Sequence, residues 1–175
     1  PKRAWPVVLA SVPVLASGLM LLSAYDQAGL LRWHWDIAGV QLSLRLNGLS
    51  VLLLLMTQVI GVAAAIYTPG YLRLSETGPL ARWLWPMMGV VLSALSLIWL
   101  ATDLLTLYAG LELMGLAAVG MLMLSGKVAA LVAGMRYLLL ALMGSLTYLL
   151  GVALILGHWG QLDLQGLAEV VEPGP

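Results

Sequence analysis

The sequence predicts an all-α integral membrane protein, a bundle of about five transmembrane helices with a short strand-like segment outside the membrane. Hydrophobic residues make up 62% of the 175 residues and charged residues only 9%, against roughly 45–50% and 25% in soluble domains. The apolar residues fall into several runs, each near the ~20 residues that cross a bilayer. A soluble fold of this length has too little interior to bury so much apolar surface, so lipid must supply that environment.

The charge balance and the residue types exclude several other classes of protein. The formal net charge is zero, which gives no basis for a nucleic-acid partner. Cysteine is absent, so the sequence offers neither a disulfide framework nor a thiolate metal site. No histidine pair stands at metal-ligand spacing, and no glycine-rich phosphate loop is present. We therefore expect no catalytic site, no metal and no cofactor.

The first two spans are expected over residues 6–24 and 48–67. The first apolar run is longer than the ~7–15 residues of a signal-peptide core, and more spans follow, so we interpret it as a helix. The polar connection over residues 25–46 ends in alternating polar and apolar residues, which predicts a strand or hairpin at the membrane surface. Asn47 is a suitable cap for the second span, and a Thr-Pro-Gly sequence after Tyr67 is expected to end it.

Three further spans are expected over residues 83–101, 103–124 and 128–157. Asp103 follows a tight turn and is expected to cap the fourth span. The fifth span is longer than a bilayer requires, so its first turns, up to Arg136, are expected at the interface. An acidic tail follows it. We treat residues 1–175 as a single transmembrane domain, and expect a fragment or truncated form of a longer protein.

The basic residues are divided unequally between the two ends of the predicted bundle. Lysine and arginine concentrate in cytoplasmic loops, which predicts a cytoplasmic N-terminal end and a C-terminal tail outside. The histidines, His34 and His158, stand beside tryptophans and are expected to anchor at the interfaces. One end collects Lys2, Arg3, Arg73, Arg82, Lys127 and Arg136, and the other Arg32 and Arg45.

Glu112 is the carboxylate that the pattern places deep within a span. Counted from Asp103, it lies about 13 Å into the membrane at 1.5 Å per residue. A charged side chain at such a depth costs roughly 2.5–3.5 kcal/mol, so it persists where it is protonated, paired or hydrated. These conditions also suit a step in a proton relay. The alternative is a protonated glutamic acid that packs helices, since Gly110, Gly115 and Gly120 permit close approach.

Polar side chains on other spans are candidates for supporting Glu112. If the helices run antiparallel, Ser145, Thr147 and Tyr148 lie near its depth, where they could hydrogen-bond it or hold water. The alternative is packing, because hydroxyl side chains in membrane helices commonly bond their own backbone. Thr57 and Gln58 in the second span leave the same two possibilities open.

Several stretches, in order, resemble the antiporter-like membrane subunits. These subunits comprise the proton-pumping subunits of respiratory complex I, the large subunits of multi-subunit sodium/proton antiporters, and relatives in membrane-bound hydrogenases and bicarbonate-uptake complexes. The family's patterns are a "DGLS … Y … YL" signature, a run leading into "WELMSL", and the helix and loop that follow. The matching stretches here are residues 44–50 (LRLNGLS), 66–72 (IYTPGYL), 91–93 (VLS), 103–108 (DLLTLY), 111–116 (LELMGL), 129–139, 144–145 (GS) and 160–164 (GQLDL).

The resemblance implies a role for Glu112. It would be the glutamate of an ion pair whose rearrangement drives proton transfer, and its partner would be a lysine on a following helix beyond Pro175. The resemblance covers nearly all of this chain but under half of a typical family member. Two positions depart from the pattern: Asn47 replaces the usual aspartate, which leaves the capping role intact, and Leu111 replaces tryptophan, which affects the positioning of Glu112.

The function expected from the sequence is translocation of protons, or of sodium, as a subunit of a larger complex in a bacterial inner membrane. Its partners would be other membrane subunits, the lipid bilayer and the transported ion. The chemistry that powers transport would belong to other subunits. A non-conducting scaffold of such a complex is the alternative. An independent secondary transporter fits less well, because five spans leave no second repeat for alternating access.

Overall fold

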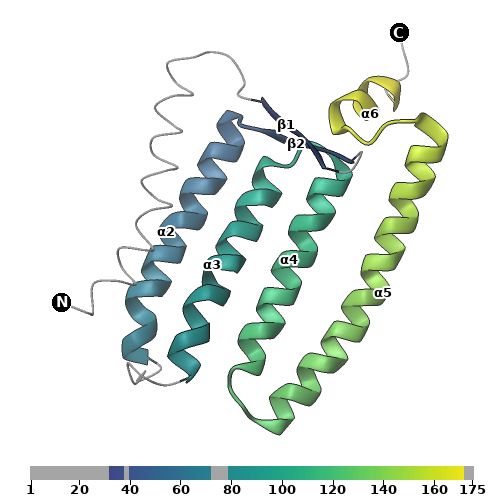
Figure 1. Ribbon diagram of the computed structural model, residues 1–175. Coiled ribbons are helices and arrows are strands. Elements are labelled where there is room, and N and C mark those ends of the chain that lie inside the picture. The colour runs from purple at the N-terminus through teal and green to yellow at the C-terminus, as the bar shows by residue number, and fades with distance from the viewer. Residues whose placement is uncertain (1–31, 38–39, 72–78, 172–175) are drawn as a thin grey trace.

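The computed structural model describes residues 32–37, 40–71 and 79–171. Its long helices are α2 (Gly48–Tyr71), α3 (Pro79–Leu100), α4 (Leu104–Met123) and α5 (Val128–Trp159). All four have segments long and apolar enough to cross a membrane. They run side by side in sequence order (Figure 1), and neighbours along the chain pack against each other. The helical membrane bundle is thus confirmed, whereas the expected first span, residues 6–24, lies outside the described residues.

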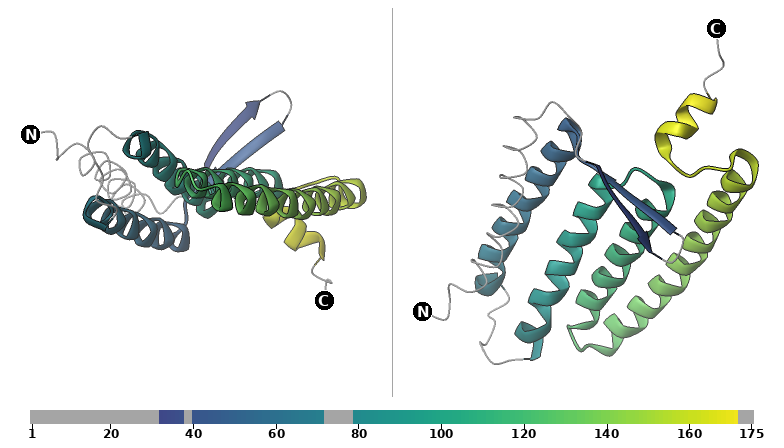
Figure 2. Two further views of the ribbon diagram at one scale, coloured as in Figure 1. Left: turned by 90° about the horizontal axis from the view of Figure 1, so that it is seen from below. Right: turned by 45° about the horizontal axis from the view of Figure 1, so that its top comes forward.

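A two-stranded hairpin lies across one end of the bundle (Figure 2). Strand β1 (Arg32–Ile37) pairs antiparallel with β2 (Val40–Arg45). The alternating pattern therefore predicted a strand correctly. A bridge between Leu44 and Ala101 joins β2 to the α3–α4 turn. Leu46, Val51 and Leu54 form a buried cluster beneath, against which two residues of α3, Trp99 and Leu100, pack.

Two predicted helix caps are observed. The Asn47 side-chain oxygen accepts a 2.7 Å hydrogen bond from the Ser50 backbone N–H at the start of α2. Asp103 caps α4 in the same way, with a 2.7 Å bond from the Thr106 N–H, and its other oxygen accepts from the Thr106 hydroxyl at 2.6 Å. The amide oxygen of Asn47 and the carboxylate of Asp103 thus each bond a backbone N–H group that the start of a helix leaves unpaired.

Several predicted helix ends differ from the structure. Helix α2 continues through Pro69 to Tyr71, beyond the expected end at Tyr67. The Thr68 hydroxyl bonds the Ala64 carbonyl at 2.6 Å, and a proline near a helix end disturbs few backbone bonds. Helix α3 begins at Pro79, whereas the candidate membrane span within it, Trp83–Leu100, begins at the predicted residue. Helix α5 has 32 residues, about 48 Å, and is inclined relative to α4 (Figure 1).

The segment after α5, predicted as an acidic tail, returns to the start of α4. Gly160 ends α5 in the left-handed conformation, with φ 69°. The Leu104 N–H bonds the Leu162 carbonyl at 3.2 Å, and the Leu164 N–H bonds the Thr102 carbonyl at 2.9 Å. A short helix, α6 (Leu164–Val171), follows. The end of the bundle near Asp103 is therefore covered by this returning segment.

Candidate functional site: the groove at Glu112

Glu112 lies on α4 and lines a groove between α4 and α5 of about 510 Å³. The helix has 20 residues, and Glu112 is close to its middle, about 13 Å from the Asp103 cap. Most of the groove lining is apolar. The polar side chains that share it with Glu112 are Tyr108, Tyr137, Ser145 and Tyr148.

Tyr108 stands one helical turn before Glu112, so the two side chains occupy the same face of α4. Its hydroxyl lies 2.8 Å from the Ser145 hydroxyl of α5, in a hydrogen bond that crosses the groove. In the sequence, Tyr108 belonged to the family-like stretch but was not predicted as a site residue. Its spacing of four residues from Glu112 could have identified it, because residues four apart on a helix lie on the same face and this places the phenol beside the carboxylate.

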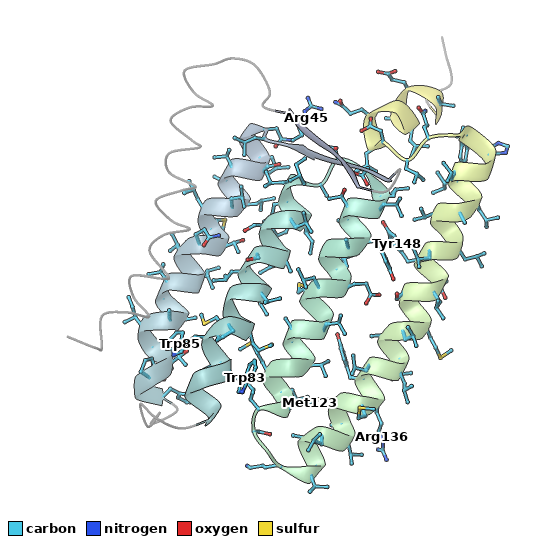
Figure 3. All side chains as sticks on the ribbon, viewed as in Figure 1. Arg45, Trp83, Trp85, Met123, Arg136 and Tyr148 are labelled. Atoms are coloured by element: carbon cyan, nitrogen blue, oxygen red, sulfur yellow. The ribbon has the colours of Figure 1, made fainter. Side chains whose placement is uncertain are left out.

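Tyr148 projects from α5 toward the first turn of α4 (Figure 3). Its hydroxyl donates a 3.0 Å hydrogen bond to the Leu104 carbonyl. Its ring stacks on that of Tyr108, with centroids 5.7 Å apart and 18° between the ring planes. The two tyrosines thus close the groove on the side of Asp103, while Glu112 lies farther along α4.

The three polar residues predicted on α5 have different surroundings. Ser145 and Tyr148 line the groove with Glu112. The Thr147 hydroxyl instead bonds the Met143 carbonyl of its own helix at 2.9 Å, in an exposed position. Thr147 is absent from the lining of this groove. The contacts of Thr147 therefore match the packing alternative.

Two of the three glycines noted on α4 stand at close contacts with α3. A Cβ at Gly110 would lie 2.6 Å from the Ile98 side chain, and one at Gly120 would lie 3.0 Å from Met87. Nothing lies within 4 Å of the corresponding position at Gly115. Gly110 and Gly120 therefore fix α3 against α4, whereas Gly115 faces the Glu112 groove.

Two of the arginines lie at opposite ends of the bundle (Figure 3). Arg136 lies near the beginning of α5 and Arg45 lies at the hairpin end. Lys127 directly precedes α5, at the end that holds Arg136. At the opposite end, His158 contacts Trp159 edge to face, with ring centroids 4.5 Å apart. Arg73 and Glu76 lie outside the described residues.

Comparisons with known proteins identify related sequences and folds. Residues 101–174 match the model of the family described as "NADH:quinone oxidoreductase/Mrp antiporter, TM". No curated protein matches the chain in sequence. The structure is similar to a chain of the membrane-bound sulfane sulfur reductase, an archaeal respiratory membrane complex. The TM-score is 0.78 at 20% identity, over 97% of this chain and 26% of that one.

A second solved structure, the Mrp complex from Dietzia sp. DQ12-45-1b, has a chain with a similar fold. The TM-score is 0.76 at 21% identity, over 94% of this chain and 18% of that one. This chain thus spans about a quarter or less of the length of these two relatives. The family match includes α4, α5 and Glu112. The predicted resemblance is confirmed: this is a multi-pass membrane protein with the sequence pattern over residues 101–174, and the fold, of an antiporter-like subunit.

Proposed function

We propose that this chain translocates protons or sodium ions as part of a subunit of a larger membrane complex, and that Glu112 is a relay residue. In this proposal the carboxylate exchanges a proton with a cationic group on another segment or chain. The electron transfer or other chemistry that powers transport belongs to other subunits. The family match and the similar folds of respiratory and Mrp complexes support the assignment to this kind of assembly.

The position of the Glu112 carboxylate is the observation on which the proposal depends. It is half-buried, near the middle of an apolar helix, and it opens into a groove rather than into a packed helix interface. Within the described residues, no hydrogen bond or ion pair engages it. An ionisable group at this depth requires water, a proton or a partner, and the groove provides room for one.

Tyr108 and Ser145 are proposed to support the relay. Their 2.8 Å hydrogen bond holds α5 beside the face of α4 that carries Glu112. Both hydroxyls line the groove, so either can bond a water molecule that reaches the carboxylate. Tyr148 is proposed to give structural hydrogen-bond support between α5 and α4 and not to carry the proton, because its hydroxyl bonds a backbone carbonyl. The self-bonded Thr147 hydroxyl has no proposed part in the relay.

We propose that the end of the bundle with Lys127 and Arg136 faces the bacterial cytoplasm. The loops that the sequence assigns to that end of the bundle hold most of the basic residues, which supports this orientation because cytoplasmic loops are enriched in lysine and arginine. The hairpin of β1 and β2, together with α6, then lies on the outer side of the inner membrane.

A non-conducting scaffold is the second candidate. The observation that favours it is the lack of any ion pair to Glu112 among the described residues, since a relay needs a cationic partner. In that case Glu112 remains protonated and contributes to packing. The two functions make opposite predictions for the removal of its charge.

The experiment that separates them is ion translocation by the native complex in sealed vesicles, with Glu112→Gln compared with wild type at equal assembly. Glutamine preserves the shape and most hydrogen bonding but cannot ionise. Glu169→Gln is the matched control, because Glu169 is an exposed carboxylate on α6. A relay predicts loss of translocation in Glu112→Gln alone. Full translocation in both variants would establish the scaffold instead.

The same vesicles identify the ion. A pH-sensitive dye reports protons, and sodium flux is followed separately with the pH gradient collapsed by an uncoupler. A proton relay predicts that only the dye signal depends on Glu112. Loss of sodium flux under uncoupled conditions would assign sodium to this site.

A further inference from the structure

A second group of polar side chains lies inside the α2–α3 interface, separate from the Glu112 groove. The Trp99 indole N–H donates to the Thr57 hydroxyl oxygen at 3.0 Å. The Gln58 amide nitrogen donates to the Ser96 hydroxyl oxygen at 3.3 Å. Both hydroxyls give their own proton to a backbone carbonyl one turn earlier in their helix, each at 2.8 Å. Each hydroxyl can therefore accept further hydrogen bonds but has no proton left to donate.

Gln58 is the residue in this group whose side-chain oxygen lacks a hydrogen bond among the described residues. Its side chain is only 5% exposed, and its Oε1 is buried without a hydrogen-bond partner among the described residues. An amide oxygen removed from water and left unbonded is strongly unfavourable, and a lipid environment offers no donor. Because buried polar atoms are nearly always hydrogen-bonded, Oε1 is expected to have a hydrogen-bond donor beside it.

Exchange of the amide oxygen and nitrogen of Gln58 would still leave polar atoms of the amide without hydrogen bonds. In the exchanged orientation Oε1 would face the Ser96 hydroxyl, whose proton is already given to the Leu92 carbonyl. Two acceptors would then face each other, and the amide N–H groups would be left unbonded. The observed orientation is thus the better one, and the missing partner must be a donor.

We propose that the α2–α3 interface binds an internal water molecule that donates a hydrogen bond to Gln58 Oε1. The site has a surplus of acceptors, since Oε1 is unbonded and the hydroxyls of Thr57 and Ser96 have already donated their protons. Water supplies two donors, and buried waters occupy polar sites of this kind while apolar cavities stay dry. The polar side chains described around the site are all uncharged, which favours a water molecule over a metal cation as the occupant.

This water is independent of the proposed relay. Gln58 belongs to the contact between α2 and α3, whereas the Glu112 groove lies on the other side of α4, against α5. Gln58 lies one turn from Gly61 on α2. A Cβ added at Gly61 would lie 2.8 Å from the Leu92 side chain, so α3 contacts α2 closely at this glycine. The proposed water site therefore lies one turn from a close contact between α2 and α3.

The first test is an electron cryo-microscopy structure of the full-length protein in lipid nanodiscs, at a resolution that shows waters. The expected result is a solvent peak within hydrogen-bonding distance of Gln58 Oε1. The peak should be lost in Gln58→Met, which has a similar length and no strong hydrogen-bonding group. The proposal is wrong if wild type has no such peak, or if a protein donor bonds Oε1.

Radiolytic footprinting gives a second readout that does not depend on map quality. Radicals formed from a bound water oxidise neighbouring side chains, and Trp99 is the reactive neighbour in this group. We expect Trp99 oxidation to fall several-fold in Gln58→Met and to stay at the wild-type level in Ser93→Ala. Ser93 is the matched control because its exposed hydroxyl bonds only the Gly89 carbonyl of its own helix. Equal Trp99 oxidation in Gln58→Met and wild type would overturn the proposal. If Gln58→Met does not fold, the presence or absence of the solvent peak in the wild-type map is the deciding result.

Discussion

The hydroxyls of Tyr108 and Ser145 lie 2.8 Å apart and join α4 to α5 one turn from Glu112. Together with the 3.0 Å bond from the Tyr148 hydroxyl to the Leu104 carbonyl, this contact connects the two helices by hydrogen bonds. Leu140 and Met143 of α5 remain 70% and 68% exposed, so part of the surface of this helix faces away from its neighbours. Gly134, which packs against Met123 and Val119, provides a further close contact.

A double-mutant cycle with Tyr108→Phe and Ser145→Ala measures this bond. Interhelical hydrogen bonds in membranes average about 0.6 kcal/mol in such cycles and reach about 1.7 kcal/mol. We expect a coupling free energy in that range, measured by SDS titration of the detergent-solubilised protein. Thr147→Val is the control, because the Thr147 hydroxyl bonds within its own helix, and its coupling to Tyr108→Phe should be near zero.

The sequence predicted those parts of the fold that depend on local pattern. Long apolar runs predicted the helices, alternation predicted β2, and residue type predicted the caps at Asn47 and Asp103. Each depends on the preferences of a few neighbouring residues. The bond between Tyr108 and Ser145 depends on how two helices are rotated and tilted against each other, which the sequence pattern alone does not specify.

The errors in the prediction have the same origin. The Thr-Pro-Gly sequence predicts the end of α2 after Tyr67, but a proline in the final turns disrupts few backbone bonds, and the helix continues to Tyr71. The sequence predicts that the acidic segment after Gly160 is a tail. Its backbone bonds to Thr102 and Leu104 instead connect it to the start of α4, more than 50 residues earlier in the chain.

Gly110→Val should destabilise the bundle. A Cβ at this position would lie 2.6 Å from the Ile98 side chain and 3.3 Å from its backbone nitrogen, so α3 and α4 would have to separate. Overpacking of this kind typically costs about 1–3 kcal/mol. Gly115→Ala is the control on the same helix, where nothing lies within 4 Å of the new Cβ. Equal unfolding midpoints for the two variants would contradict the close α3–α4 contact.

Asp103→Ala should also destabilise the protein. It removes the cap of α4 and the acceptor of the Thr106 hydroxyl, both within a buried site. Loss of a helix N-cap costs about 0.5–2 kcal/mol, and the buried Thr106 hydroxyl left without its acceptor adds to that cost. Asp103→Asn preserves an oxygen for the Thr106 N–H, so it should recover part of the lost stability in the same SDS titration. An alanine variant as stable as the asparagine variant would argue against the cap.

Tyr148→Phe separates the two contacts of this side chain. The phenylalanine ring preserves the stacking on Tyr108, whereas the hydrogen bond to the Leu104 carbonyl is lost. A neutral hydrogen bond contributes about 0.5–1.5 kcal/mol net, so we expect a modest loss of stability in SDS titration. Because the hydroxyl bonds backbone and not Glu112, translocation in vesicles should stay near the wild-type rate once the complex is assembled. A collapse of translocation as large as that of Glu112→Gln, at equal assembly, would instead make the Tyr148 hydroxyl a member of the relay, and would extend the proton path from the groove toward Leu104 and the hairpin end of α4.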